Sequence, residues 1–249
     1  MNFSIYQSLL SISQTKGAGY FVLIDPDKIG ESHIPAFVQQ ASEAGVDAIL
    51  VGGSLIVDDS FERCISTLKQ HSKIPVIIFP GNSMQVSKSA DAMLFLSLLS
   101  GRNPEYLIGN QVLAAPIIKK IGLEAIATAY LLIESGRPTS AEFMSNTRPI
   151  PRHKPDIAVA HALAAEILGF KLIYLEAGSG ALQPVPEEII GAIKKYCSIP
   201  LIVGGGITTP EEARKKVLAG ASFIVTGNVL EKNGNQNLMK EFASAIHAK

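Results

Sequence analysis

The chain has 249 residues, of which 47% are hydrophobic and 18% charged, a balance that excludes an intrinsically disordered protein. Basic and acidic residues each number 22, so the formal net charge is zero and no basic surplus points to a nucleic-acid partner. No run reaches the roughly 18 apolar residues that a membrane span needs, and the first residues lack the basic start of a signal peptide. We therefore expect a cytoplasmic protein without a membrane span.

Eight short apolar runs alternate with amphipathic stretches along the chain. Most of the runs are apolar on both faces, which is typical of parallel strands covered by helices. The predicted strands are 20–24, 47–51, 76–79, 92–96, 124–133, 172–176, 200–204 and 222–226. The predicted helices are 34–44, 59–70, 105–120, 155–168, 186–196, 210–219 and 236–247. This alternation predicts a (β/α)8 barrel, a TIM barrel, over a single domain of residues 1–249. An open doubly wound sheet is disfavoured, because no dinucleotide-binding glycine motif follows the first strand.

Two segments break the alternation. Between Phe79 and Met93, Pro80, Gly81 and a polar run leave little room for a helix, so we expect the third helix to be short or missing. Residues 134–154 form a connection much longer than most loops, for which a binding loop over the barrel mouth and an inert surface excursion are equally good interpretations.

Glycine-containing loops follow the last two predicted strands. Strand 200–204 runs into Gly205 and Gly206, and strand 222–226 runs into Gly227 and Asn228. Glycine lets backbone N–H groups approach an anion, and barrels commonly place a phosphate site at these two loops. The helix after Gly206 would add partial positive charge at its N-terminus. Tight turns are the simpler explanation of one such loop, but two in these positions favour phosphate.

The sixth predicted strand ends in polar and small residues. Tyr174 and Glu176 are two apart and share a face, so both can point into the barrel mouth. A carboxylate and a phenol would then lie beside the phosphate loops, with a rim salt bridge of Glu176 as the structural alternative. Whether Tyr130, on the fifth strand, faces the mouth or the core is left open. His161 lies inside the predicted helix 155–168, away from any strand end, which favours a packing role over catalysis.

The first two predicted strands end in a candidate metal site. The first strand is followed by Asp25 and Asp27, and the second by glycines and Ser54. Mg²⁺ typically takes one or two carboxylates together with substrate oxygens and water. An ordinary Asp-Pro turn, with Lys28 pairing locally, explains the first segment about equally well.

In order along the chain, these segments resemble the geranylgeranylglyceryl phosphate synthase family, including its bacterial members related to heptaprenylglyceryl phosphate synthase. The resemblance extends from about Phe21 to Leu230. Its motifs are LIDPDK, VGGS, IYLEAGSG, VGGGI and TGNV. It implies a modified barrel without its third helix. It also implies a prenyltransferase that joins the 3-hydroxyl of sn-glycerol 1-phosphate to a long prenyl diphosphate, geranylgeranyl diphosphate by expectation, in the presence of Mg²⁺.

The resemblance also implies roles for individual residues. Asp25 would bind Mg²⁺, with Ser54 completing that side, and Glu176 would be the base for the glycerol hydroxyl. Glycerol phosphate would contact Tyr174, Leu175, Glu176, Ala177, Gly178, Ser179, Gly180, Gly205, Gly206, Gly227 and Asn228. The family further implies a homo-oligomer, a dimer or a hexamer.

The sequence departs from many relatives at two places, which places it in the second branch of the family. Leu23 stands where those relatives carry a lysine two residues before the metal aspartate. The YLEAGSG segment likewise replaces their YIEYSG form. Positive charge for the diphosphate must then come from Lys28 or from the insertion, with Arg137, Arg148 and Arg152 as candidates.

Two other classes of function remain compatible with the residues. One is another phosphosugar enzyme on the same scaffold, an isomerase or a synthase, which would share the phosphate loops but need no metal site. A Schiff-base aldolase fits poorly, because Lys171 lies at the start of its strand. The other class is a non-catalytic barrel that binds a phosphorylated metabolite. The sequence does not indicate the length of the prenyl chain. The apolar stretch 93–117 is only a candidate wall of the groove that would hold it.

Overall fold

Eight parallel strands form a closed barrel in the order in which they occur along the chain. The computed structural model describes residues 4–56, 60–233 and 237–247. The strands are β1 (Gly19–Ile24), β2 (Ala48–Val51), β3 (Val76–Ile78), β4 (Ala92–Leu98), β5 (Glu124–Leu132), β6 (Leu172–Glu176), β7 (Leu201–Gly204) and β8 (Phe223–Thr226). The barrel predicted from the alternation of apolar runs is confirmed.

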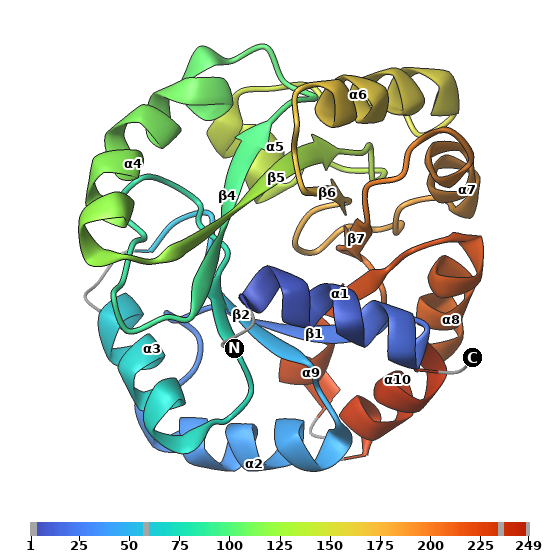
Figure 1. Cartoon of the computed structure of the whole chain (residues 1–249). Coiled ribbons are helices and arrows are strands. Elements are labelled where there is room, and N and C mark those ends of the chain that lie inside the picture. Colours follow the sequence, from blue (N-terminus) through green and yellow to red (C-terminus); the bar gives the residue numbers. More distant parts are fainter. Residues whose placement is uncertain (1–3, 57–59, 234–236, 248–249) are drawn as a thin grey trace.

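Helices surround the barrel (Figure 1). After the strands come α2 (Ile34–Ala44), α3 (Ser60–His71), α4 (Asn110–Ile121), α6 (Pro155–Ile167), α7 (Glu187–Tyr196), α8 (Pro210–Ala219) and α10 (Leu238–Ile246). Short elements add a 3-10 turn (Glu31–His33), a π-helical turn (Glu105–Gly109), α5 (Ser140–Ser145) and α9 (Asn228–Asn233). The sequence analysis did not predict α1 (Ile5–Lys16), α5 or α9.

No helix follows β3: residues 79–91, all of which the structure describes, form turns and extended chain. The missing third helix is therefore confirmed. β3 pairs with β4 only at Ile77–Ala92 and Ile78–Met93, whereas β4 continues along β5 as far as Leu98. Beyond Met93 the two strands are no longer paired. Figure 1 shows no helix along the chain between α3 and β4.

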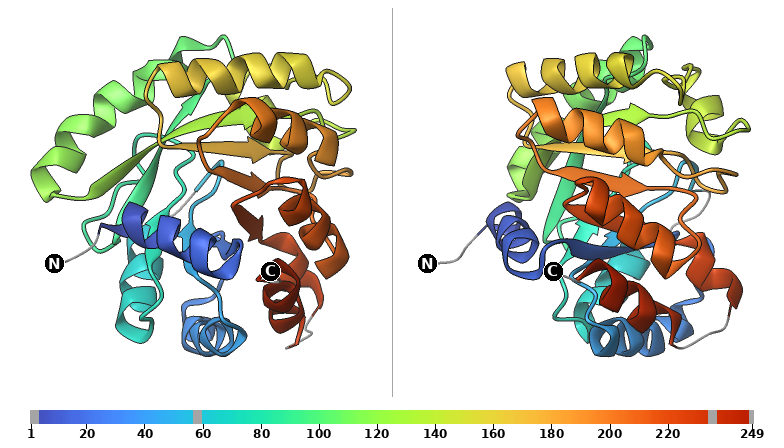
Figure 2. Two further views of the ribbon diagram at one scale, coloured as in Figure 1. Left: turned by 45° about the vertical axis from the view of Figure 1, so that its right-hand side comes forward. Right: turned by 90° about the vertical axis from the view of Figure 1, so that its right-hand side faces the viewer.

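Helix α1 closes the end of the barrel at which the strands begin (Figure 2). Its Leu9 is fully buried and packs with the apolar side chains inside the barrel, which include Phe21 and Phe223. Glu124, at the start of β5, accepts hydrogen bonds from the N–H groups of Ile5 (2.7 Å) and Tyr6 (3.0 Å), so its carboxylate satisfies the first turn of α1. The barrel can therefore admit a ligand only at its opposite end, where the strands terminate.

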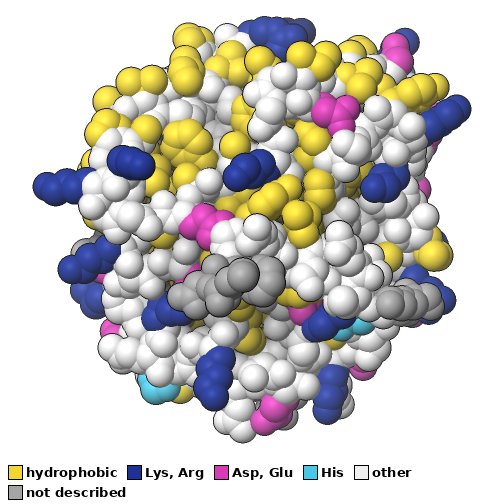
Figure 3. Space-filling view, viewed as in Figure 1, with side chains coloured by type: hydrophobic (Ala, Val, Ile, Leu, Met, Phe, Trp, Pro, Cys, Tyr) yellow, Lys and Arg dark blue, Asp and Glu magenta, His cyan; other side chains and the backbone are white. Residues whose placement is uncertain are grey.

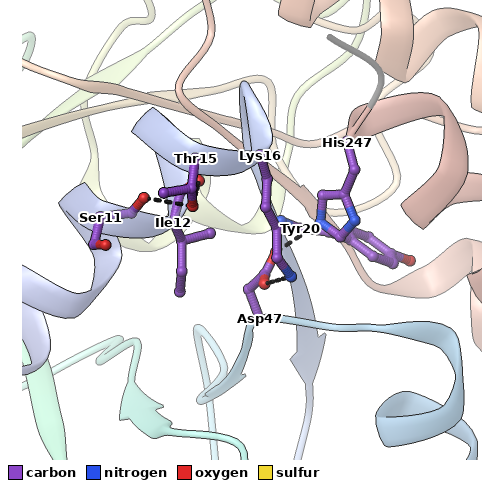
Figure 4. Close-up of polar contacts among 7 residues, drawn as sticks. All are labelled: Ser11, Ile12, Thr15, Lys16, Tyr20, Asp47 and His247. Carbon is purple, nitrogen blue, oxygen red and sulfur yellow. Dashed lines mark hydrogen bonds and ion pairs between the residues drawn. The ribbon is translucent and has the colours of Figure 1, made fainter.

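Asp47, just before β2, joins the first and last helices of the barrel (Figure 4). Its side chain is 4% exposed and pairs with Lys16 Nζ at 2.5 Å and with His247 Nε2 at 2.8 Å. It also accepts the N–H of Tyr20 at 2.8 Å. Burial alone would raise the pKa of Asp47, but these three donors outweigh burial and hold the pKa below its usual value.

The outer surface carries apolar side chains along α4 and its preceding turn, and Figure 3 shows apolar atoms gathered on that side of the molecule. Exposed here are Ile108, Val112, Leu113 and Ile117. Among the described residues, no helix combines the length and the apolar character required to cross a membrane.

Candidate active site

A large cavity of about 1040 Å³ opens where the strands end. It is lined by residues from the loops after β1, β2, β3, β6, β7 and β8, from the insertion after β5, and from β4 and α4. Loops at this end of a parallel barrel carry function in nearly all barrel enzymes. Three parts of the cavity differ in chemistry and are described in turn: a glycine-rich part, an acidic part and an apolar part.

Glu176 lies at the base of the glycine-rich part. It is the last residue of β6 and only 5% exposed. Burial raises the pKa of Glu176 to about 7, although hydrogen bonds from the Gly178 N–H and the Tyr174 and Tyr130 hydroxyls oppose the shift. The Gly178 N–H lies 2.5 Å from Glu176 Oε1. A carboxylate with a pKa close to neutral can both accept and release a proton under physiological conditions.

Two tyrosines hold Glu176 in place. Tyr130 and Tyr174 are partners in the β5–β6 register, and each hydrogen-bonds to the Glu176 carboxylate. Burial and the neighbouring carboxylate raise the pKa of both phenols well above the usual value, so they remain protonated donors. The Phe79 ring stacks on Tyr174 with centroids 4.9 Å apart. The alternative left open for Tyr130 is thus resolved: its side chain lines the cavity.

The loop after β7 approaches Glu176 closely. Gly205 has φ +81° and Gly206 has φ +71°, the left-handed region in which other residues are strained. A Cβ on Gly205 would collide with the Glu176 carboxylate and with the Gly178 backbone. Within the described part of the chain, the Gly205 and Gly206 N–H groups donate to no protein acceptor. Both residues are partly exposed to the cavity, so these two donors are available to an anion.

The loop after β8 lies against the loop after β6. Asn228 donates from Nδ2 to Ser179 Oγ at 2.9 Å, and Gly227 approaches the Leu23 carbonyl. The N-terminus of α8 carries a capping box: Glu212 accepts from the Thr208 and Thr209 N–H groups, and its own N–H donates to Thr209 Oγ1. The partial positive charge expected of this helix end is not tested by these contacts, and the expectation stays a prediction.

Asp25 and Ser54 both line the acidic part. Asp25 accepts the Asp27 N–H at 3.2 Å and pairs with Lys28 Nζ at 2.8 Å. A Cβ on Gly53 would lie 3.3 Å from Asp25 Oδ1, so the loop after β2 passes directly beside the carboxylate. Asp25, Lys28, Gly53 and Ser54 all line the cavity.

The donor set at this end suits Mg²⁺ if water or substrate oxygens complete the coordination. Among the described residues, no three His, Cys, Asp or Glu side chains gather to hold a metal ion. One carboxylate and one hydroxyl remain, together with room in the cavity. Mg²⁺ is commonly bound in this way, by one or two carboxylates plus phosphate oxygens and water, so Asp25 and Ser54 fit the ion.

The apolar part of the cavity extends past the unpaired edges of β3 and β4. Its lining combines Phe79 and Pro80 with part of the predicted 93–117 wall, namely Met93, Phe95, Leu96, Leu98, Tyr106, Asn110, Gln111 and Ala114. Gln111 connects α4 to β4 by donating to the Leu96 carbonyl. Because β3 stops early and no helix follows it, the cavity has space for a long apolar group here.

The insertion covers the mouth, as one of its two interpretations predicted. Residues 137–141 and 143–145 line the cavity. On one side Arg137 donates to the Gly180 carbonyl. On the other side Tyr106 donates from its hydroxyl to the Met144 carbonyl at 3.1 Å. The insertion therefore connects the glycine-rich part of the cavity with the apolar part.

Most of the predicted site residues come together in the cavity, and two do not. Leu175 and Ala177 face away from it and are buried, and the Ala177 N–H is already bonded to the Gly204 carbonyl at 3.1 Å. Of the three candidate arginines, only Arg137 lines the cavity. Arg152 instead donates to the Glu134 carbonyl at 3.1 Å. Phe79 was not predicted as a member of the site, and Tyr130 was left open; the register of β5 against β6 places Tyr130 beside Tyr174.

Comparison with known proteins agrees with the resemblance. Residues 11–246 match the model of the PcrB family. Over 248 residues the chain is 46% identical to geranylgeranylglyceryl phosphate synthase of Chitinophaga pinensis, covering 100% of this chain and 98% of that protein. It is 48% identical to the synthase of Thermococcus kodakarensis, over 89% of this chain and 88% of the relative.

Solved structures give the same result. The chain superimposes with a TM-score of 0.94 and 36% identity on (S)-3-O-geranylgeranylglyceryl phosphate synthase of Thermoplasma acidophilum in complex with its substrate sn-glycerol-1-phosphate, covering 99% of both chains. An archaeal fructose 1,6-bisphosphate aldolase, at 12% identity and a TM-score of 0.61, shares only the fold. The model of the PcrB family matches residues 11–246, and the Chitinophaga pinensis synthase matches the whole length of the chain. The chain therefore belongs to the PcrB family.

Proposed function

We propose that this protein is a prenyltransferase that forms an ether bond between the 3-hydroxyl of sn-glycerol 1-phosphate and a long-chain prenyl diphosphate, releasing diphosphate. The observation that carries the proposal is the cavity itself. One continuous space joins glycine loops with available N–H groups, a buried carboxylate with a pKa of about 7, a carboxylate and hydroxyl suited to Mg²⁺, and an apolar extension. Each part matches one part of the two substrates.

The glycine-rich part suits the glycerol phosphate. The Gly205 and Gly206 N–H groups can donate to phosphate oxygens, and Ser179 and Asn228 add polar atoms beside them. With the phosphate there, the glycerol chain extends toward Glu176. The related synthase that binds sn-glycerol-1-phosphate supports this assignment through its likeness over the whole chain.

Glu176 is the proposed base. The glycerol 3-oxygen forms a bond to the first carbon of the prenyl chain while the bond from that carbon to the diphosphate oxygen breaks. The hydroxyl proton passes to the Glu176 carboxylate. Tyr130 and Tyr174 keep the carboxylate oriented, because their hydroxyls remain protonated and hydrogen-bonded to it. General-base catalysis of this kind typically contributes about 10²–10⁴ in rate.

Asp25 and Ser54 are the proposed ligands of Mg²⁺, and the diphosphate would complete the coordination. When bound, Mg²⁺ would offset the negative charge that develops on the departing diphosphate. The prenyl chain would occupy the apolar part between β3, β4 and α4. The family's homo-oligomer, a dimer or hexamer, stays a prediction that light scattering in solution tests.

A mass-spectrometric assay tests the function. The protein receives sn-glycerol 1-phosphate or its mirror image, Mg²⁺, and prenyl diphosphates of several lengths. We expect a product whose mass equals glycerol phosphate plus the prenyl group, formed with sn-glycerol 1-phosphate and absent without Mg²⁺. Binding of glycerol phosphate without product for any prenyl diphosphate would instead favour the non-catalytic alternative.

A further inference from the structure

The charges around the acidic part of the cavity do not balance those of the proposed substrate. A prenyl diphosphate carries more negative charge than one divalent cation offsets, and Asp25 adds another negative charge beside it. Among the described residues, the cavity is lined by two basic side chains, Lys28 and Arg137. Arg137 contacts the Gly180 carbonyl in the glycine-rich part. Lys28 is thus the cation placed at the acidic part.

Lys28 is bound to the very carboxylate that is proposed to take the metal. Its Nζ lies 2.8 Å from Asp25 Oδ2, and the other oxygen of Asp25 accepts the Asp27 N–H. The backbone keeps the two residues in one turn, because the Lys28 N–H donates to the Asp25 carbonyl at 3.0 Å. A metal ion on Oδ2 competes with this close ion pair, since the ammonium occupies one side of the same oxygen and repels a second cation.

We propose that Lys28 changes partner during substrate binding: it neutralises Asp25 while the site is empty, and it contacts the diphosphate once Asp25 coordinates Mg²⁺. The inference rests on the proposed function, because it requires a diphosphate at this end of the cavity. The side chain is suited to the exchange. It is 49% exposed, and its four-carbon stem is flexible.

The exchange has two consequences of opposite sign. Without a diphosphate, Lys28 competes with a divalent cation for Asp25, so it weakens metal binding. With the metal in place, Lys28 adds a charge-assisted hydrogen bond to a phosphate oxygen, so it strengthens diphosphate binding. A lysine that only supports the fold of the loop would affect both affinities in the same direction.

Binding measurements on the whole protein test the exchange without any catalytic readout. Mn²⁺, an EPR-visible substitute for Mg²⁺, is titrated into wild type, Lys28→Ala and Lys88→Ala. Inorganic diphosphate is then titrated calorimetrically at saturating Mg²⁺. Lys88 is exposed and outside the cavity, so its variant removes the same charge from the surface as a control. Lys28→Arg keeps the charge in the loop.

We expect Lys28→Ala to bind Mn²⁺ several-fold more tightly than wild type and inorganic diphosphate about tenfold more weakly. Lys28→Arg should restore most of the diphosphate affinity, and Lys88→Ala should match wild type in both. The inference is overturned if Lys28→Ala weakens both ligands or leaves both unchanged while wild type binds them. Wild type that binds neither Mn²⁺ nor diphosphate would contradict the metal and diphosphate assignments themselves, and this inference with them.

Discussion

Tyr130 lies directly beside Tyr174 across the β5–β6 ladder, with ring centroids 5.5 Å apart, and both hydroxyls donate to the carboxylate of Glu176. Burial raises the pKa of the Glu176 carboxyl, and the two hydroxyl donors partly offset this rise because they stabilise the ionised form. The pair therefore determines how close to neutrality Glu176 titrates, and the first three predictions follow from it.

Glu176→Gln should lower kcat by about 10²–10⁴, because an amide cannot take the hydroxyl proton. The kcat of Glu176→Asp should lie between those of Glu176→Gln and wild type. Steady-state kinetics with sn-glycerol 1-phosphate measure the effect, and circular dichroism checks the fold. A Gln variant that kept more than about a tenth of wild-type kcat would eliminate proton removal by Glu176, since the loss would then be under about 1.4 kcal/mol.

The pH dependence should show the ionisation of Glu176. Because its pKa in the folded protein is about 7, the base is fully available only above that pH, so kcat/KM should rise through neutrality and then level off. Folding stability has the opposite trend. Between the ordinary carboxyl pKa of 4.5 and about pH 7, the folded protein binds the Glu176 proton more tightly than the unfolded chain does. The contribution of Glu176 to the free energy of unfolding therefore falls as the pH rises through this range. Glu176→Gln should abolish both trends.

Tyr130→Phe should move the rising limb of that profile to higher pH. The change removes one hydroxyl donor to Glu176 and leaves the ring, so the proton is held more tightly. The pH profile of kcat/KM is the measurement, with Tyr106→Phe as the control, because Tyr106 donates to Met144 and not to Glu176. Identical profiles for both variants would contradict the role given to Tyr130.

Gly206→Ala should raise the KM for glycerol phosphate at least tenfold with a smaller effect on kcat. A Cβ there would come within about 3.0 Å of the Pro184 backbone and displace the loop that offers its N–H groups. Gly169→Ala is the control for backbone strain. Gly169 also has a positive φ (+83°), but it has no neighbour within 4 Å and lies outside the cavity. Both variants should lose about 1–2 kcal/mol of stability, and only Gly206→Ala should change KM.

Asp47→Asn should lower the free energy of unfolding by about 2–4 kcal/mol, because it leaves Lys16 and His247 without their buried partner. Since the folded pKa of Asp47 is depressed, its stabilisation is present at neutral pH and is lost as the pH falls below the ordinary value of 3.8. Urea denaturation at several pH values measures this. Glu43→Gln, an exposed change on α2, should have little effect.

The barrel and most of its site were predictable because periodicity and turn residues act locally. Apolar runs identified all eight strands, and Pro80 and Gly81 indicated the missing helix. The α1 helix was missed, because its burial depends on contacts between Leu9 and the barrel interior, which no local pattern shows. Tyr130 was undecided for the same reason, since its direction follows from pairing with a strand more than 40 residues away.

Joining the first and last helices through Asp47 has a consequence during protein synthesis. The His247–Asp47 contact spans 200 residues, and β1 can pair with β8 only after residues 223–226 have been made. At about 5–20 residues per second, the ribosome needs on the order of ten to forty seconds to supply them. Throughout that time one edge of β1 has unpaired N–H and C=O groups, which favour association with other chains. The rate of translation of the residues between β1 and β8 therefore sets how long the nascent protein is exposed to aggregation.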